Sequence, residues 1–508
     1  MARYFLGIDA GNTVVKTVLF DAAGAEIAHA SREAVSHCPA PGFVERDIDQ
    51  LRNDLLTVVA EVVKKSGVDA TDIAAIGSAG HGNGLYLLGD NATALLGIQS
   101  LDTRANALVD QLQSEGVGDV SYPISGQRPW VSQTPTLLAW VKRERPEIYQ
   151  ATQTVLLCKD LVTHALTGEL VSDISDIGGC GMLRMPENTY DDALLEAFDI
   201  GDAREKLPRL AHPSEIVGHV SKAVADQTGL GEGTPVVAGF FDVIASALGS
   251  GVARPGQASM IVGTWSINQL VVENIDFENE NEIFMSSGYA DGRFMSIESS
   301  ATSAVNLEWV VREFLEHDGE VVAGKSPFEL ANELVTNSTL CLDAPFYHPY
   351  LYGAPGNGMA RAGFFGVGGW HGRSDMLRAI YEGVIFAHLR HMDKLRATGV
   401  TFDTIILSGG GARSNIWPQI IADILELPLT VAKCQETGAL GAAMAASVGV
   451  EMYHDYEQAA DKMVQTDRHY TPNPVASELY RKRFALWGEL EQAMVPFWSR
   501  FAAASSTS

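Results

Sequence analysis

Residues 235–265, PVVAGFFDVIASALGSGVARPGQASMIVGTW, decide the fold that this chain is expected to adopt. The apolar start predicts a strand that ends at Asp242, and the small residues after it predict a helix. A Pro-Gly break at 255–256 comes before a second strand, which ends in a turn at Gly263 and Thr264. A carboxylate at the end of a buried strand, with a Gly-Thr turn soon after it, predicts a site where two halves of the chain meet.

Length and charge narrow the class of protein. The 508 residues exceed what one hydrophobic core supports, so two or three domains are expected. The net charge of −27 argues against nucleic acid or an acidic membrane as partner, because like charges repel. A phosphate ligand would then need backbone N–H groups or a divalent cation to supply local positive potential.

The cysteines and the N-terminal residues favour a cytoplasmic enzyme. Five cysteines are scattered along the chain without a CxxC spacing, which fits neither a disulfide framework nor a zinc cluster. The first residues lead directly into a strand-like segment, and no apolar run is long enough to span a bilayer. We therefore expect a reducing compartment and no membrane partner.

Residues 4–30 predict three strands, with the first turn at 10–13. Gly11 and Asn12 are expected to adopt the left-handed backbone of a tight hairpin, so that N–H groups point into the turn. With the Thr13 hydroxyl and the charge of Lys16, this turn becomes a candidate phosphate cradle. The alternative is an ordinary surface hairpin whose turn is capped by Asp9.

The next segments predict a helix over 47–66 and then a pocket for a hydroxylated ligand. A glycine-dense turn at 77–84 would let the backbone approach the ligand, with His81 and Asn83 reading its hydroxyl groups. The alternative is that these two side chains are merely solvated. Asp102, two residues before Arg104, either chelates a polyol or caps the following helix and pairs with its neighbours.

The second half repeats the pattern of strand, turn and strand around Gly263 and Thr264. Two βββα units, each with a hydroxyl-bearing turn, predict a duplicated domain with a cleft between the copies, although hairpins can recur by chance. Farther on, a strand at 404–408, glycines at 409–411 and a helix from 416 predict a nucleoside-contacting loop. Taken alone, that loop also fits a helix-capping turn.

Two tempting patterns are rejected. The GxxxxGK[ST] match at 319–326 follows helical rather than strand spacing, and Ser326 with Pro327 reads as a helix start. His388 and His391 have no third ligand, so they are interpreted as an ordinary helix face rather than a metal site.

Together the two phosphate turns, the nucleoside loop and the polyol pocket predict phosphoryl transfer. Asp242 would act as the general base that takes a proton from a substrate hydroxyl, which then attacks the γ-phosphorus of ATP. Such a transfer depends on positioning and charge neutralisation, so a Mg²⁺ ion held largely through water and backbone donors would suffice.

At this point a set of motifs, in order, resembles the FGGY carbohydrate kinase family over nearly the whole chain. They are GIDAGNTVVK, GFVERD, GHGNG, LDTR, LTGE with SDISD, GFFD, GTW, YEGV and GGGARSNIWPQIIADIL. The resemblance implies an α/β fold of two actin-like, ribonuclease-H-like domains, each a βββαβαβα unit, that close on sugar and ATP. The expected parts are a sugar-binding domain at 1–253, a nucleotide-binding domain at 254–495 and a flexible tail at 496–508. A homodimer is left open.

Position within these motifs implies roles for single residues. Asp242 falls on the catalytic base, and Asp9 falls on a metal-associated carboxylate, with Asp242 as the second residue near the metal. The implied phosphate contacts are Gly11, Asn12, Thr13, Lys16, Gly263 and Thr264. The implied nucleoside contacts are Gly410, Gly411 and Asn415, and the implied sugar contacts are His81, Gly82, Asn83, Asp102 and Asp242.

Within the family, GNGLYLL, FFDV and GTWSI are similar to the L-xylulose kinase branch, which implies a ketopentose substrate. The chain has Gly82 and Asn83 where glycerol kinases carry Arg-Glu and D-xylulose kinases tend to have Met-His. Val243 replaces a polar neighbour of the base, and Ser100 stands where many members have Trp. Erythritol, D-xylulose, ribulose and glycerol stay as alternative substrates, and a non-catalytic actin-like nucleotide switch stays as the alternative function.

Overall fold

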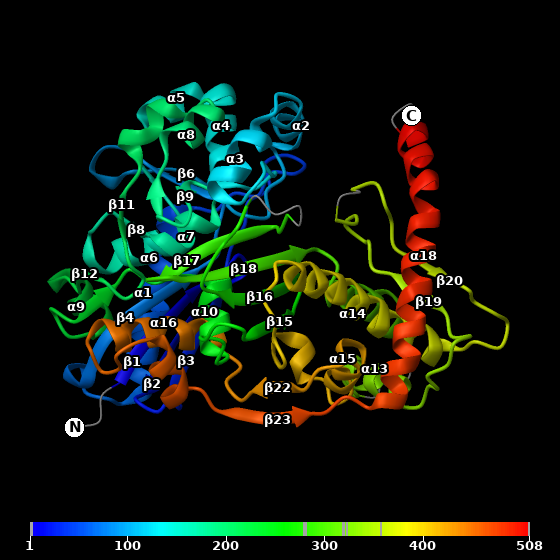
Figure 1. The fold of residues 1–508 in the computed structure, drawn as a ribbon. Helices are drawn as coiled ribbons and strands as arrows, with labels where there is room; N and C mark the ends of the chain where they lie inside the picture. The colour runs from blue at the N-terminus through cyan, green and yellow to red at the C-terminus, as the bar shows by residue number, and fades with distance from the viewer. Residues whose placement is uncertain (1–3, 278–281, 317–320, 322–323, 356–357, 506–508) are drawn as a thin grey trace. The chain divides into compact units, whose positions relative to one another are not determined.

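The computed structural model describes residues 4–277, 282–316, 321, 324–355 and 358–505. The chain forms two compact units (Figure 1). The first comprises Met1–Pro255, Val271–Ser296 and Glu436–Gln465, and the second comprises Gly256–Leu270, Ile297–Gln435 and Thr466–Ser508. Residues 436–465, which the sequence grouped with the second domain, thus belong to the first unit.

The first unit is built on a mixed sheet with the strand order β12-β13-β4-β1-β2-β3, in which the short strand β14 also pairs with β4. The antiparallel pair of β1 and β2 sets Asp9 opposite Lys16, and β1 runs parallel to β4. These strands are β1 (Tyr4–Ala10), β2 (Val14–Asp21), β3 (Glu26–Glu33), β4 (Ile73–Gly80), β12 (Ile216–His219), β13 (Pro235–Val237) and β14 (Phe240–Phe241). The three strands predicted over residues 4–30 are confirmed.

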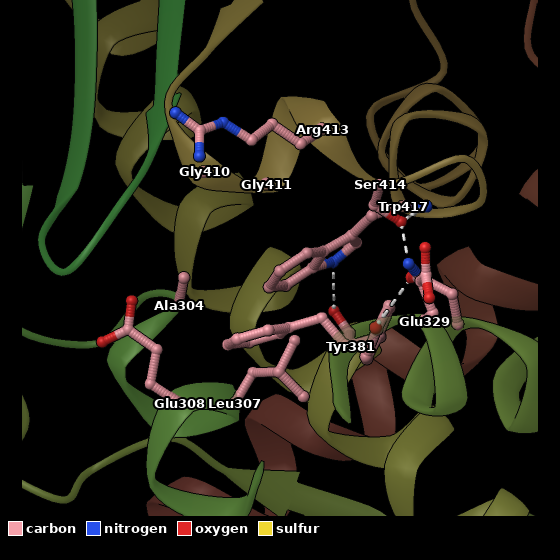
Figure 2. Close-up of a pocket in the computed structure, with 12 residues that line it drawn as sticks. Ala304, Leu307, Glu308, Glu329, Tyr381, Gly410, Gly411, Arg413, Ser414 and Trp417 are labelled. Carbon is pink, nitrogen blue, oxygen red and sulfur yellow. Dashed lines mark hydrogen bonds between the residues drawn. The ribbon is translucent and has the colours of Figure 1, made fainter. Parts of the chain in front are cut away.

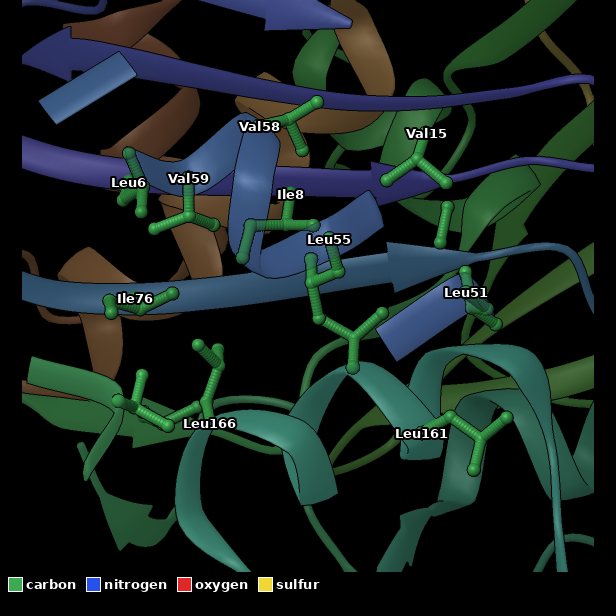
Figure 3. Packing of buried hydrophobic residues seen from close by; sticks show 14 of the residues in the cluster. Leu6, Ile8, Val15, Leu51, Leu55, Val58, Val59, Ile76, Leu161 and Leu166 are labelled. Carbon is green, nitrogen blue, oxygen red and sulfur yellow. The ribbon is translucent and has the colours of Figure 1, made fainter. Parts of the chain in front are cut away.

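Helix α1 (Ile48–Ser66) covers one face of this sheet. Its N-terminus is capped by Asp47, which accepts from the N–H of Gln50 at 2.8 Å, and Gly67 ends it in the left-handed conformation. Its apolar side packs against inward-facing strand residues (Figure 3), among them Leu6, Ile8 and Ile76. The predicted helix over 47–66 is therefore confirmed.

Helix α16 (Thr437–Gly449) covers the opposite face. Because side chains alternate along a strand, Gly7 and Gly77 point away from α1, and a Cβ on either would lie 1.9 Å from a carbonyl oxygen of α16, that of Ala439 or Ala442. Only hydrogen fits at such positions. This corrects the predicted turn at 77–84: β4 continues to Gly80, and Gly77 serves helix packing rather than ligand approach.

The turn between β1 and β2 also differs from the prediction. Neither Gly11 nor Asn12 has a positive φ. The turn is closed instead by the N–H of Gly11, which donates to the Val14 carbonyl at 3.0 Å. Three residues separate the strands, so the chain reverses without the left-handed pair that a two-residue hairpin needs.

Other elements of the first unit surround this sheet. The helices are α2 (Asn106–Ser114), α3 (Val117–Ser125), α4 (Thr134–Glu144), α5 (Pro146–Ala151), α6 (Cys158–Thr167), α7 (Ile174–Gly179), α8 (Asp192–Ala197), α9 (Lys222–Thr228), α10 (Asp242–Gly249) and α17 (Tyr456–Met463). The strands are β5 (Leu85–Leu88), β6 (Ala94–Ile98), β7 (Thr154–Leu156), β8 (Val171–Asp173), β9 (Leu183–Arg184), β10 (Thr189–Tyr190), β11 (Arg209–Ala211) and β17 (Met285–Ala290).

The second unit repeats the strand order of the first. Its sheet has the order β17-β18-β16-β15-β21-β22-β23, in which all strands but the edge strand β17 correspond to strands of the first sheet. Strand β15 runs antiparallel to β16 and parallel to β21, as β1 does to β2 and β4. The strands are β15 (Ala258–Val262), β16 (Ser266–Val272), β18 (Arg293–Ser300), β21 (Ile405–Ser408), β22 (Leu429–Ala432) and β23 (Thr466–Tyr470). The predicted duplicated α/β fold is therefore confirmed.

The helices of the second unit are α11 (Val305–Val310), α13 (Pro327–Thr336), α14 (Arg373–Ala397), α15 (Trp417–Leu425) and α18 (Pro474–Ser505), and a short pair β19 (Phe346–His348) and β20 (Gly363–Phe365) lies between α13 and α14 in the chain. Ser326 caps α13 and Pro327 is its first residue, as expected when the phosphate-loop pattern was rejected. Part of that pattern, 319–320 and 322–323, lies outside the described residues. The tail expected from residue 496 is helical up to Ser505.

No helix within the described parts of the chain combines the length and apolarity that crossing a membrane requires.

Candidate functional site

Two carboxylates meet at one edge of the sheet in the first unit. Ala79 on β4 pairs with Asp9 on β1 and with Phe240 on β14. Asp242 follows β14 directly as the first residue of α10. The register of three neighbouring strands thus brings Asp9 and Asp242, which are 233 positions apart in the sequence, to the same place.

Asp9 and Asp242 are both half-buried. Desolvation raises the pKa of Asp9 to about 6, against the charge of Lys16 and together with that of Glu436. Desolvation also raises the pKa of Asp242 well above its usual range, and the negative charge of Asp9 raises it further. The site therefore brings together two carboxyl groups whose ionised forms are disfavoured by their surroundings and by each other.

This donor set fits a magnesium ion, because Mg²⁺ prefers carboxylate oxygens and commonly keeps several waters. Asp9 and Asp242 are two such groups. Across the described residues, no cluster of three or more His, Cys, Asp or Glu side chains is arranged to hold a metal. An ion held here would thus depend on water and on phosphate oxygens for its other ligands.

Lys16 has a partner that the sequence did not reveal. Its ammonium group forms a close ion pair with Glu436, which immediately precedes α16. A Cβ on Gly438 would lie 2.4 Å from Oδ2 of Asp9, so the first turn of α16 lies directly against that carboxylate. Glu436 and Gly438 are therefore members of the site, although they come from residues 436–465, far along the chain.

Residues from other segments of the first unit hold the turn at 11–13 in place through hydrogen bonds. Arg46, which is 4% exposed, donates to the Gly11 carbonyl at 3.0 Å. Gln99 donates to the carbonyl of Asn12 at 2.8 Å, and the Asn12 side chain donates to Ser100 Oγ at 2.9 Å. Ser100, noted as a departure from the family pattern, thus anchors Asn12, while Thr13 is exposed.

His81 and Asn83 are buried next to this edge. Nε2 of His81 lies 2.9 Å from the Tyr86 hydroxyl, and burial, with the charge of Arg46, lowers the pKa of His81 to about 3. The imidazole is therefore neutral at physiological pH. Asn83 donates to the Gly179 carbonyl at 3.3 Å, and its Oδ1 is buried with no hydrogen-bond partner in the described part of the chain. That oxygen is an acceptor available to a ligand hydroxyl.

Gly82 is required by packing. A Cβ on this residue would lie 2.3 Å from the ring of Phe241, and one on Gly179 would lie 2.8 Å from the same ring. Phe241, the neighbour of Asp242, is thus enclosed between two glycines. Any larger side chain at position 82 would displace it.

The carboxylate of Asp102 accepts hydrogen bonds from other parts of the protein. Arg104 donates to both of its oxygens at 2.8–3.0 Å, and the N–H of Val44 donates to Oδ2 at 2.6 Å. This is the second of the two roles that the sequence left open, pairing with neighbours. A sugar contact by Asp102 stays a prediction.

Two side chains with buried polar atoms in the first unit, Asp176 and Trp130, were assigned no role from the sequence. Both carboxylate oxygens of Asp176 are buried without a hydrogen-bond partner in the described part of the chain. Lys159 is engaged by Asp160 at 2.6 Å and by Asp173 at 3.1 Å, and burial raises the pKa of Asp176 well above its usual range. Trp130 Nε1 is also buried and unpaired among the described residues. Asp176 is the last residue of the SDISD motif, but the sequence of that motif gives no sign that Asp176 lacks a hydrogen-bond partner.

The second unit has a pocket of about 400 Å³ (Figure 2). One wall is aromatic, with the rings of Tyr381 and Trp417 4.6 Å apart and Trp417 Nε1 donating to the Tyr381 carbonyl at 3.2 Å. Gly410 and Gly411 line the pocket, as do three charged residues, Glu308, Glu329 and Arg413. The size, flat walls and available carboxylate suit a nucleoside.

The predicted nucleotide residues are distributed unevenly around this pocket. Gly410 and Gly411 line it, whereas the exposed Asn415 is not among its lining residues. Ala304 lines the pocket, and its N–H also donates to the Gly263 carbonyl at 2.8 Å. The turn of Gly263 and Thr264 is thereby tied to the pocket wall.

Comparison with known proteins places this architecture in a class. Models of the FGGY family of carbohydrate kinases match the N-terminal domain over residues 4–249 and the C-terminal domain over residues 258–450. Fold and matches together define a phosphotransferase with an alcohol group as acceptor. The chain belongs to the FGGY family of carbohydrate kinases and is an ATP-dependent sugar kinase.

Curated relatives of nearly equal length support this placement. The chain is 32% identical to the L-xylulose/3-keto-L-gulonate kinase of Escherichia coli (strain K12), over 98% of this chain and 99% of that protein. It is 28% identical to the autoinducer-2 kinase of Enterobacter sp. (strain 638), over 95% of this chain and 93% of that protein.

Solved structures share the fold. The structure of gluconate kinase from Lactobacillus acidophilus has a TM-score of 0.90 at 23% identity and covers 99% of this chain and 100% of that one. The structure of xylulose kinase from Rhodospirillum rubrum has a TM-score of 0.88 at 25% identity, covering 98% and 100%.

Proposed function

We propose that this kinase phosphorylates a ketopentose of the xylulose type, with Asp242 as the general base. The observation that supports this most is the position of Asp242: it is desolvated beside Asp9 and adjoins the ring that packs on Gly82. A carboxylate whose pKa is raised is a stronger base once it is ionised, which suits it to remove a proton from an alcohol during transfer.

In this proposal the protein contributes mainly position and charge. His81 and Asn83 orient the sugar, and the free Oδ1 of Asn83 accepts from one of its hydroxyl groups. Asp242 takes the proton of the hydroxyl that attacks the γ-phosphorus, and the proton stays on its carboxyl group. The neutral His81 adds no competing charge near the base.

For ATP, the proposed contacts are residues of each unit taken separately. The phosphates would contact the turn at 11–13, Lys16 and the turn of Gly263 and Thr264, and the nucleoside would occupy the pocket beside Gly410 and Gly411. Asn415 stays a proposed contact at its edge. Magnesium, held by Asp9 and Asp242, would neutralise phosphate charge.

The ketopentose assignment rests on relatives and on pocket shape. The similar Escherichia coli protein is an L-xylulose/3-keto-L-gulonate kinase, and Gly82 leaves no room for the arginine expected of a glycerol kinase. Erythritol, D-xylulose, ribulose and glycerol are the alternatives to be tested. A homodimer stays open as the assembly.

The base assignment is tested with Asp242→Asn, which keeps the shape of the side chain and removes its basicity. We expect kcat for sugar-dependent ADP release to fall at least ~10²-fold, the usual cost of losing a general base. Asp110→Asn on α2, at an exposed carboxylate, is the matched control and should leave the rate unchanged. Activity of Asp242→Asn within about tenfold of wild type would show that another group takes the proton.

A further inference from the structure

Helix α14 carries two buried histidines that use both ring nitrogens. His388 is fully buried and His391 is 4% exposed. They face strands β16 and β18 and the loop at 301–304, which follows β18 and leads into α11. The interpretation of these residues as an ordinary helix face is incomplete, because every ring nitrogen has a polar partner.

His391 begins one chain of hydrogen bonds. Its Nδ1 lies 2.8 Å from Glu298 Oε2, and a buried carboxylate accepts, so Nδ1 carries the proton. Its Nε2 lies 2.7 Å from Ser300 Oγ, which in turn lies 2.7 Å from Thr302 Oγ1. The chain therefore ends on a hydroxyl of the loop at 301–304.

His388 begins a second chain that reaches the next residue of this loop. Its Nδ1 lies 2.8 Å from Asn268 Oδ1, while the amide of Asn268 donates to Ser266 Oγ at 3.1 Å. Nδ1 is thus the donor, and Nε2 is left to accept from the Ser303 hydroxyl at 3.0 Å. Burial and the neighbouring His391 lower the pKa of His388 to about 3, which keeps this arrangement at any working pH.

The loop held in this way supports two parts of the nucleotide site. Ala304, the residue after Ser303, donates its N–H to the Gly263 carbonyl at 2.8 Å and also lines the pocket in Figure 2. Ser266, whose Oγ lies 3.2 Å from His388 Nδ1, is the first residue of β16 and lies two residues after Thr264. Both sides of the Gly263 turn are therefore tied to His388.

We propose that His388 is a positioning residue that, through Ser303 and Ala304, fixes the Gly263 turn and the adjoining pocket wall for binding ATP. This inference rests on the proposed function, in which that turn contacts phosphate. His388 touches no ligand itself. Its effect is to keep the Gly263 and Ala304 backbone in the binding geometry before the nucleotide arrives, which lowers the ordering cost of binding.

Ser303→Ala removes the hydroxyl that hydrogen-bonds to His388 and is the smallest change that tests the proposal. His388→Leu and His388→Gln test the histidine itself. In Ser303→Ala and His388→Leu, the Kd for ADP, measured by calorimetry, and the KM for ATP should rise about tenfold, the usual effect of losing one buried hydrogen bond. The KM for sugar should stay within about twofold of wild type. His388→Gln supplies an amide in place of the ring and should recover most of the loss.

His469→Leu is the matched control, because His469 is an exposed histidine on β23 that contacts only Thr430 among the hydrogen bonds of the described residues. It should leave nucleotide affinity unchanged. A folded Ser303→Ala protein with wild-type Kd for ADP would overturn the inference alone, even if His388→Leu failed to fold. A wild-type protein that bound no ADP would overturn the proposed function together with it.

Discussion

At the scale of the residue, the first unit contains several carboxyl groups that have few positively charged partners. Asp242 and Asp9 gather at one sheet edge, while Asp160 and Asp173 share the single ammonium group of Lys159. Asp176 is left without a hydrogen bond from the described residues. An uncompensated carboxylate inside a protein is expected to take up a proton or to await a ligand.

Asp176→Asn should make the protein more stable at neutral pH. Because the folded pKa of Asp176 is raised, the folded state holds a proton that the unfolded state has lost above about pH 4, so this residue lowers stability as pH rises. Removing the acid should raise the melting temperature by a few degrees, and this gain should grow as the pH rises above about 4, the pKa of an unfolded Asp.

Asp226→Asn is the control for this prediction, since that carboxylate is exposed beside Lys222 and should show no such trend. An Asp176→Asn protein that melted several degrees lower at pH 8 than wild type would mean that the ionised Asp176 stabilises the folded state.

At the scale of the element, helix α16 packs so closely on the first sheet that two strand residues facing it, Gly7 and Gly77, must be glycine. Gly77→Ala should destabilise the first unit by more than ~3 kcal/mol, because its Cβ would lie 1.9 Å from the Ala442 carbonyl and backbone cannot move aside cheaply. Chemical denaturation measures the loss. Gly369→Ala, where an added Cβ meets nothing within 4 Å, should be neutral. Equal stability of the two variants would contradict the packing account.

Local elements were predictable and distant partners were not. Asp47 and Gly67 mark the ends of α1 by rules that need only neighbouring residues, and the prediction was confirmed. The glycines at 77–84 were read as a ligand turn because the helix that requires Gly77 lies more than 350 positions away. The ion pair between Lys16 and Glu436 was likewise unpredictable, because the two residues lie 420 positions apart in the sequence.

At the scale of the whole molecule, the chain contains two units of the same fold, and the two proposed ligands are assigned to different units. Each unit has the same order of six strands. Asp9 lies near the end of the first strand of one unit, and Gly263 directly follows the first strand of the other. The residues proposed for sugar lie in the first unit, and the nucleoside-sized pocket lies in the second. Motif order predicted this arrangement, whereas the pocket walls at Tyr381, Trp417 and Glu308 come from segments whose meeting only the fold reveals.

The central claim is that this kinase transfers phosphate from ATP to a ketopentose. The most direct measurement is mass spectrometry of the products formed from ATP, magnesium and a panel of L-xylulose, D-xylulose, L-ribulose, erythritol and glycerol. The account predicts a ketopentose phosphate formed with one ADP per molecule, fastest with a xylulose, and its loss in Asp242→Asn. Turnover of ATP at one rate with every compound, with no phosphorylated sugar, would contradict it.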